Sequence, residues 1–157
     1  QRSLEMAVTD SLTGLRNRRY VTRHLEGLLR AGGATLLLID VDRFKSVNDT
    51  YGHAAGDKAL QRFTTLCCNA LRNVDIFGRW GGEEFLVMLP GHDSASATRI
   101  MEAFRRSLEL QPIARPAVTV SIGISSTASG RIRLIALVPA SATSASTDVS
   151  ASVSTCT

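Results

Sequence analysis

The sequence lacks the features of a membrane protein, a disulfide scaffold or a nucleic acid-binding protein. No apolar run is long enough to span a bilayer, and Gln1–Asp10 lack the apolar core of a signal peptide. Of the 3 cysteines, Cys67 and Cys68 are adjacent in a predicted helix and Cys156 lies near the C-terminus, so we expect reduced thiols and a cytoplasmic location. The net charge of +4 suits a small polyanionic partner but is too small to indicate DNA or RNA.

The composition that is present indicates one globular domain. Hydrophobic residues make up 44% and charged residues 20% of the 157 residues, and a chain of this length can bury a core without cross-links. Because the sequence begins at Gln1 rather than Met, we expect a piece of a longer protein with an upstream regulatory domain. We divide it into the end of a linker helix at 1–8, a folded domain at 9–125 and an atypical tail at 126–157.

Hydrophobic periodicity predicts the secondary structure. In chain order, the predicted elements are a helix at 18–29, a buried strand at 34–39, a polar loop at 48–53, a helix at 54–71, strands at 75–80 and 85–89 joined by a glycine turn, a helix at 95–110 and a strand at 117–124. A hairpin in the middle of this order predicts an α+β fold, in which one antiparallel or mixed sheet carries its helices on one face.

The C-terminal stretch differs in composition from the rest of the chain. Residues 139–157 are almost all Ser, Thr and Ala with some Val, and Asp148 is their only charged residue. Such tracts bury too little apolar area to offset the entropy of ordering, so we expect this stretch to be disordered or weakly ordered. Residues 131–138 are ambiguous, and a short strand is one alternative.

Carboxylates stand at two places that the fold can bring together. Asp40 and Asp42 come at the end of the predicted buried strand, and Glu83 and Glu84 come at the tip of the hairpin. Clustered carboxylates repel one another unless a cation neutralises them, and oxygen ligands favour Mg²⁺ or Mn²⁺. Two such ions close together suit phosphoryl transfer. Ordinary surface acids beside a tight turn are the alternative that spacing alone leaves open.

Residues 81–85 read GGEEF, which resembles the GG(D/E)EF signature of the GGDEF family of diguanylate cyclases. Four further stretches resemble that family's motifs in the same order: DSLTGLRNRR at 10–19, LIDVDRFK at 38–45, VNDTYGHAAGD at 47–57 and VSIGI at 120–124. Five motifs in order make the resemblance highly specific. It implies a palm-like α+β fold related to class III nucleotidyl cyclases, with a central sheet flanked by helices.

The resemblance also implies an activity. A diguanylate cyclase condenses two GTP molecules into cyclic di-GMP and two pyrophosphates, by attack of a 3′-hydroxyl on an α-phosphate. Each domain supplies half of the site, so catalysis requires a homodimer. Carried over by position, Asp40, the carbonyl of Val41, Glu83 and Glu84 are expected to ligate two Mg²⁺ or Mn²⁺ ions, and Glu83 is expected to activate the 3′-hydroxyl.

Further positions are expected to bind GTP. Lys45 would stabilise phosphate charge in the transition state, and Asn48 and Asp57 would recognise the guanine edge. Other residues expected beside the substrate are His53, Gly82 and the backbone of Arg43 and Phe44. Less specific interpretations stay open, namely a solvated Lys45, a packed turn histidine at His53, an Asx turn at 48–49 and a core role for Phe44.

Residues 72–75 read RNVD and resemble the family's R-x-x-D inhibitory site, where many relatives bind the cyclic di-GMP product. Arg72 would fork onto a guanine or phosphate, and Asp75 would accept from the guanine edge. Arg99 or Arg105 on the following helix would supply a further arginine. A salt bridge at the end of a helix is the ordinary alternative.

After Ile124 the sequence departs from the family pattern. A helix similar to A-D-x-A-L-Y-x-A-K-x-x-G-R-N should follow and contact the GTP phosphates, but residues 126–157 contain no Lys or Tyr and, as Arg, only Arg131 and Arg133. A frameshift near Ser129 is one hypothesis. The departure predicts reduced activity, so an impaired domain that binds cyclic di-GMP or GTP is the alternative function.

Overall fold

The computed structural model describes residues 7–31, 34–114, 118–126 and 133–138. In chain order its elements are α2 (Arg18–Arg30), β1 (Thr35–Val41), α3 (Phe44–Tyr51), α4 (His53–Cys68), β2 (Ile76–Arg79), β3 (Glu84–Leu89), α5 (Ser94–Leu110), β4 (Val120–Ser126) and β5 (Arg133–Val138). The predicted helices at 18–29, 54–71 and 95–110 therefore correspond to α2, α4 and α5, with small shifts at their ends.

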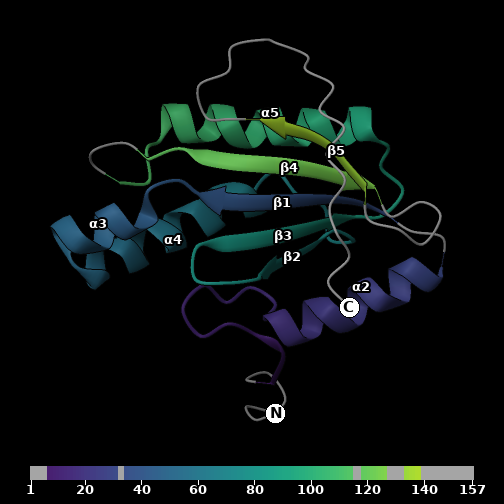
Figure 1. The fold of residues 1–157 in the computed structure, drawn as a ribbon, viewed down its shortest axis with the longest axis horizontal. Helices are drawn as coiled ribbons and strands as arrows, with labels where there is room; N and C mark the ends of the chain where they lie inside the picture. The colour runs from purple at the N-terminus through teal and green to yellow at the C-terminus, as the bar shows by residue number, and fades with distance from the viewer. Residues whose placement is uncertain (1–6, 32–33, 115–117, 127–132, 139–157) are drawn as a thin grey trace.

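The strands form one antiparallel sheet in the order β2-β3-β1-β4-β5. β1 lies at its centre, where its apolar residues Leu36, Leu37 and Ile39 are buried on both faces. Figure 1 shows α5 along the top of the view and α2 along the bottom, with the strands between them. The predicted α+β class with an antiparallel sheet flanked by helices is confirmed.

The larger part of the core lies on the face covered by α4 and α5. Ile39, Phe85 and Val87 point to this face from the strands, and Phe104 packs on them from α5. Phe63 of α4 stacks at a tilt on Phe85, with ring centroids 4.7 Å apart. Burying each such side chain contributes roughly 1.5–3 kcal/mol relative to exposure, which fixes these helices on the sheet.

α2 packs on the opposite face of the sheet. Val21 of this helix shares a buried cluster with Leu36 and Met88, which alternate along their strands with the residues that face α4 and α5. Asn17 begins the helix, because its side chain accepts from the amide of Tyr20 at 3.0 Å. The expectation that the helices lie on one face is therefore wrong for α2, whose apolar side covers the second face.

The polar loop expected at 48–53 is also wrong. α3 and α4 together cover this range except for Gly52, which separates them with a φ of 87°, a conformation that favours glycine. The composition misled because α3 is short and buries only Phe44 and Val47. Apart from the half-buried Asn48, its other positions are exposed, so no apolar stripe marks the helix.

Part of the segment beyond residue 125 is described. β5 pairs with β4, with Ile122 opposite Val138, so the short strand left open for 131–138 is present over 133–138. The rest of the predicted tail lies outside the described residues. At the other end Ala7 and Val8 are helical, and the remainder of the predicted linker helix lies outside the described residues. The division of the chain at residue 125 stays a prediction.

The described ranges contain no cysteine pairing and no membrane-spanning helix. Cys67 and Cys68 are free thiols, the first buried and the second exposed. Burial raises the pKa of the Cys67 thiol well above its usual value, so this residue acts as a small core side chain rather than a nucleophile. No helix in these ranges is both long and apolar enough to cross a membrane.

Candidate functional site

The register of β1 and β3 brings the predicted carboxylates to one end of the sheet. Asp40 lies inside β1, opposite Glu84, which is the first residue of β3. The pairing continues one step further, because the amide of Val41 donates to the carbonyl of Glu83 at 3.1 Å. Asp40, Val41 and Glu84 therefore lie in two adjacent strands, and Glu83, immediately before β3, is bonded to Val41 through its carbonyl.

Carboxylates at this end of the sheet lie close enough to repel one another. Partial burial raises the pKa of Asp40, and repulsion from Glu83, Glu84 and Asp42 raises it further. In the part of the chain that the structure describes, no three His, Cys, Asp or Glu side chains converge to form a preformed metal site. A cation bound here would therefore need ligand or water oxygens to complete its coordination.

Asp42 is directed away from the other acids. Its carboxylate accepts from the hydroxyl of Thr119 at 2.9 Å and from that of Ser121 at 2.7 Å. Its amide also donates to the carbonyl of Thr119 at 2.8 Å. Asp42 therefore fastens the end of β1 to the start of β4, while its charge still acts on Asp40.

Arg43 forms the turn between β1 and α3 in a left-handed conformation, at φ 56° and ψ 27°. It is the one non-glycine residue with positive φ in the described ranges, and this conformation costs about 1 kcal/mol for a residue with a Cβ. Lys45 follows in the first turn of α3, exposed and without an ion pair among the described residues. The amide of Ser46 donates to the carbonyl of Arg43 at 3.0 Å, so the amides of Phe44 and Lys45 are the donors that this turn offers to an anion, beside the charge of Lys45. Phe44, by contrast, is buried in the core.

Asn48 of α3 packs against Gly56 of α4. The side-chain oxygen of Asn48 is buried and has no hydrogen-bond partner. A Cβ on Gly56 would overlap this oxygen, so the glycine makes room for it. Asp57 and His53 lie on the same helix and are exposed. A buried acceptor without a donor is costly, so this oxygen requires a donor from water or from a ligand group.

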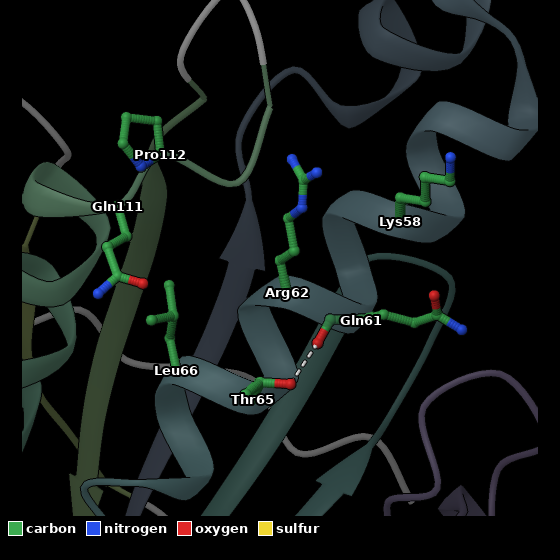
Figure 2. A pocket seen from close by; sticks show the side chains of 7 residues that line it. All are labelled: Lys58, Gln61, Arg62, Thr65, Leu66, Gln111 and Pro112. Atoms are coloured by element: carbon green, nitrogen blue, oxygen red, sulfur yellow. Dashed lines mark hydrogen bonds between the residues drawn. The ribbon is translucent and has the colours of Figure 1, made fainter.

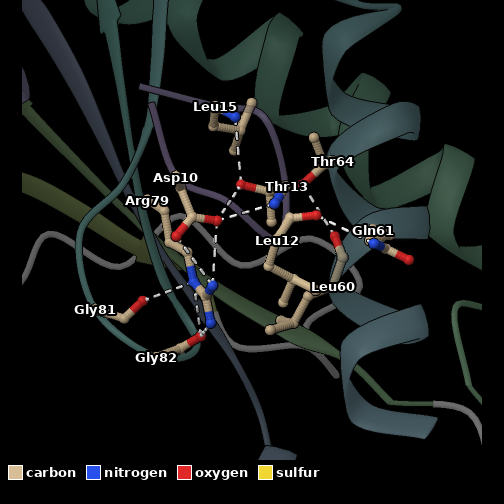
Figure 3. Close-up of polar contacts among 10 residues, drawn as sticks. All are labelled: Asp10, Leu12, Thr13, Leu15, Leu60, Gln61, Thr64, Arg79, Gly81 and Gly82. Atoms are coloured by element: carbon tan, nitrogen blue, oxygen red, sulfur yellow. Dashed lines mark hydrogen bonds and ion pairs between the residues drawn. The ribbon is translucent and has the colours of Figure 1, made fainter. Parts of the chain in front are cut away.

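Arg79, which the sequence interpretation missed, holds the turn between β2 and β3. Its guanidinium donates to the carbonyls of Gly81 and Gly82, at 2.8 Å from Nη2 to Gly82, and to both carboxylate oxygens of Asp10 at 3.2 Å (Figure 3). Asp10 accepts in addition from the amide and the hydroxyl of Thr13. The only signal in the sequence is a basic residue two places before the glycine pair.

Arg72 and Asp75 form a closed pair before β2. The amide, Nε and Nη2 of Arg72 all donate to the Asp75 carboxylate, at 2.8 Å from Nη2, and Nη2 also donates to the carbonyl of Pro90. The side chain of Arg72 is 49% exposed, whereas that of Asp75 is fully buried. The salt bridge left open by the sequence is therefore present, and a ligand in this arrangement reaches Arg72 but not the Asp75 carboxylate.

The two candidate arginines of α5 differ in their surroundings. Arg105 is paired with Glu102 and Glu109 on its own helix. Arg99 donates to a serine hydroxyl and has no ion pair with an acid among the described residues. Arg99 also lies nearer the start of α5. The loop before this helix contains Pro90, whose carbonyl accepts from Arg72.

The structure also contains a cavity of about 440 Å³ between α4 and the chain that follows α5 (Figure 2). Lys58 and Arg62 line it from α4, and Gln111 and Pro112 line it from the other side. None of the predicted site residues lines this cavity. We therefore place the candidate site at the crowded carboxylates and the unpartnered Asn48 oxygen, because the carboxylates lack a neutralising charge and this oxygen lacks a hydrogen-bond donor.

Comparison with known protein families agrees with the fold described above. Residues 7–145 match the family described as diguanylate cyclase, GGDEF domain. The match covers most of the chain and includes every described strand. The chain therefore belongs to the GGDEF family of diguanylate cyclase domains.

Individual relatives are similar over most of this chain. It is 44% identical over 137 residues to the response regulator PleD of Caulobacter vibrioides, covering 80% of this chain and 30% of PleD. It is 39% identical over 135 residues to diguanylate cyclase A of Treponema denticola, covering 78% and 36%. The chain thus spans about a third of the length of these curated relatives.

A solved structure has the same fold. The coiled coil and GGDEF domain of DgcB from Caulobacter crescentus, crystallised in complex with c-di-GMP, superposes with a TM-score of 0.75. The two sequences are 25% identical, and the match covers 83% of this chain and 75% of the DgcB chain.

Proposed function

We propose that this domain condenses two GTP molecules into cyclic di-GMP and two pyrophosphates, with Mg²⁺ or Mn²⁺, across a homodimer. The observation that carries the proposal is the pairing of β1 with β3, which sets Asp40 opposite Glu84 and bonds Val41 to Glu83. Membership in the cyclase family and the similarity to diguanylate cyclase A support it.

The donors at this end of the sheet suit a hard divalent cation. Asp40, Glu83 and Glu84 offer carboxylate oxygens, and Val41 offers a backbone carbonyl. A cation held among them relieves the repulsion that raises the pKa of Asp40. A pair of Mg²⁺ ions, when bound, supplies positive charge at the α-phosphate and lowers the pKa of the ribose 3′-hydroxyl.

Glu83 is the residue that we assign to the 3′-hydroxyl. Its carboxylate accepts the proton while the 3′-oxygen forms a bond to the α-phosphorus of the other GTP. The bond from that phosphorus to the bridging oxygen breaks, and pyrophosphate leaves with its electron pair. The same step in the opposite direction closes the ring. Lys45 and the free amides at the start of α3 stabilise the phosphate charge throughout.

We assign guanine recognition to Asn48 and Asp57. The unpartnered oxygen of Asn48 needs a donor, and a guanine edge offers N–H groups. The exposed Asp57 carboxylate accepts from N1–H and N2–H, a pair of donors that adenine lacks, so a site built this way rejects ATP. His53, Gly82 and the backbone of Arg43 and Phe44 complete the proposed substrate contacts.

Replacing Gly56 with alanine should raise the KM for GTP about tenfold or more. The added Cβ would overlap the Asn48 oxygen and lie 3.0 Å from the Cζ of Phe44, so Asn48 must leave its position. Losing one buried hydrogen bond to the substrate costs about 1–3 kcal/mol, and 1.4 kcal/mol is tenfold. Steady-state kinetics with GTP, alongside a thermal melt, measures the effect.

Gly27→Ala in α2 is the matched control. A Cβ on Gly27 has no heavy atom within 4 Å, so this variant should keep its KM and gain up to about 1 kcal/mol of helix stability. An unchanged KM in a folded Gly56→Ala protein would show that Asn48 does not bind the base.

Formation of cyclic di-GMP from GTP and Mg²⁺, followed by chromatography over a series of protein concentrations, tests the function itself. Because each chain holds one GTP and two chains must meet, the rate should rise more steeply than linearly with protein concentration. Absence of product from a folded sample would refute the cyclase proposal.

A second candidate function is a module that binds cyclic di-GMP without turnover, and the exposed guanidinium of Arg72 favours it. Calorimetry with cyclic di-GMP should then give saturable heat that Arg72→Ala reduces at least about tenfold, since charge-assisted hydrogen bonds contribute about 1.5–3 kcal/mol. Arg106→Ala on the exposed surface of α5 is the control. No heat with the unmodified protein would exclude this function.

A further inference from the structure

In the part of the chain that the structure describes, one side chain bonds to the backbone of the turn before Glu83. Among the described residues, Arg79 is the side chain that donates to the carbonyls of both Gly81 and Gly82. The next carbonyl, that of Glu83, accepts from the amide of Val41, and that of Glu84 accepts from the amides of Trp80 and Gly81. The path of the backbone into Glu83 therefore depends on where Arg79 places its guanidinium.

Asp10 determines that placement. It accepts from Nη1 of Arg79 with both oxygens at 3.2 Å, and it is itself fixed by the amide of Thr13 at 2.9 Å and its hydroxyl at 2.7 Å. Partial burial acts to raise the pKa of Asp10, but the Thr13 hydrogen bonds and the Arg79 charge outweigh it and the pKa is lowered. Asp10 therefore stays ionised at neutral pH.

The backbone of Arg79 is anchored to the same segment. Its amide donates to the carbonyl of Arg16 at 2.9 Å, and the amide of Arg16 donates to the carbonyl of Phe77 at 3.3 Å. The side chains of Arg79 and Asp10 are each only 20% exposed, so water competes weakly for these contacts. Figure 3 shows the guanidinium between the Asp10 carboxylate and the two glycine carbonyls.

The geometry points to Arg79 as a positioning residue for the reaction, oriented by Asp10, that holds the Gly81–Gly82 backbone so that Glu83 meets the 3′-hydroxyl. This inference rests on the proposed cyclase function for its kinetic part. Arginine is required because its planar group reaches three acceptor groups in fixed directions, whereas a lysine ammonium is a single point. A displacement of about 1 Å at the reacting group can cost about 100-fold in rate.

Arg79→Lys should therefore lower kcat about tenfold or more while leaving the KM for GTP within about twofold, because Arg79 touches no residue assigned to GTP binding except the backbone of Gly82. Asp10→Asn should act in the same direction but less strongly, since the side-chain oxygen of the introduced asparagine can still accept from Thr13. The double variant should be no slower than Arg79→Lys alone, because the two changes remove the same interaction between Arg79 and Asp10.

Two matched controls separate positioning from general surface effects. Arg106→Lys alters an exposed arginine of α5 that belongs to no proposed site, and Asp93→Asn alters a carboxylate that accepts from the amide three residues on, as Asp10 does. Both should keep kcat and KM within about twofold of the unmodified protein.

Amide hydrogen exchange provides a readout that needs no turnover. The amides of Val41, Trp80 and Gly81 are protected by the Glu83 and Glu84 carbonyls, so Arg79→Lys should speed their exchange at least about tenfold, and Arg106→Lys should not. Unchanged exchange, or a change in KM alone, would overturn the inference. If the unmodified protein forms no cyclic di-GMP, the proposed function fails, and exchange alone then decides whether Arg79 holds the turn.

Discussion

Glu83→Gln should lower the rate of cyclic di-GMP formation by about 1,000-fold while the fold stays intact. Glutamine keeps the size and shape of the side chain but can neither accept the 3′-hydroxyl proton nor neutralise a cation. A positioned general base contributes about 10²–10⁴ in rate, and loss of a metal ligand adds to that. Single-turnover chromatography of the product measures the effect.

The backbone around Glu83 should be undisturbed in this variant, because its carbonyl, not its side chain, bonds to Val41. The circular dichroism spectrum should therefore match that of the unmodified protein, and the melting temperature should be no lower, because the variant also loses the repulsion between Glu83 and Asp40. Glu109→Gln, at a side chain 61% exposed near the end of α5, is the chemically identical control and should retain full activity. Substantial turnover by Glu83→Gln would remove the assigned role.

Asp40→Asn should have opposite effects on activity and on stability. Activity should fall at least about 100-fold, because a cation at this end contributes several kcal/mol to the transition state and each 1.4 kcal/mol is tenfold. In metal-free buffer at neutral pH, the variant should be more stable by less than about 1 kcal/mol, since it loses the repulsion from Glu83 and Glu84 at an exposed position.

The pH dependence follows from the direction of the shift. The pKa of Asp40 is raised in the folded protein, so the folded state binds the proton more tightly than the unfolded state. Without metal, stability should therefore fall as pH rises from the usual Asp pKa through the raised pKa. Asp40→Asn should remove that component, and Mg²⁺ should raise the melting temperature of the unmodified protein but not of the variant. Equal responses to Mg²⁺ would contradict a metal role for Asp40.

Local patterns predicted most of the secondary structure but not its assembly. The apolar run that became β1 and the glycine turn between β2 and β3 were recognisable because burial and turn chemistry act on neighbouring residues. α3 was not, because a short helix with two buried residues has no apolar stripe that differs from a loop. The position of α2 was also missed, since its apolar side alone does not say which face of the sheet it covers.

The same limit applies to the candidate site. Asp40, Glu83 and Glu84 are recognisable from their motifs. Their closeness across two strands depends on the register of β1 and β3, which the motifs do not give. The unpartnered oxygen of Asn48 depends on the contact between α3 and α4, and no spacing rule reveals it. Arg79 was overlooked for the same reason, because its partner Asp10 lies 69 residues away in the sequence.

The family, the fold class and the residue types available for chemistry follow from the order of the amino acids, because motifs and hydrophobic periodicity are local properties of the chain. The packing of the folded chain was needed to establish which strands pair, that Asp42 bonds to Thr119 rather than joining the other acids, and that Arg72 forms a salt bridge with Asp75. Hydrogen bonds and charge repulsion act over a few ångströms, so they depend on packing between residues that are distant in the sequence.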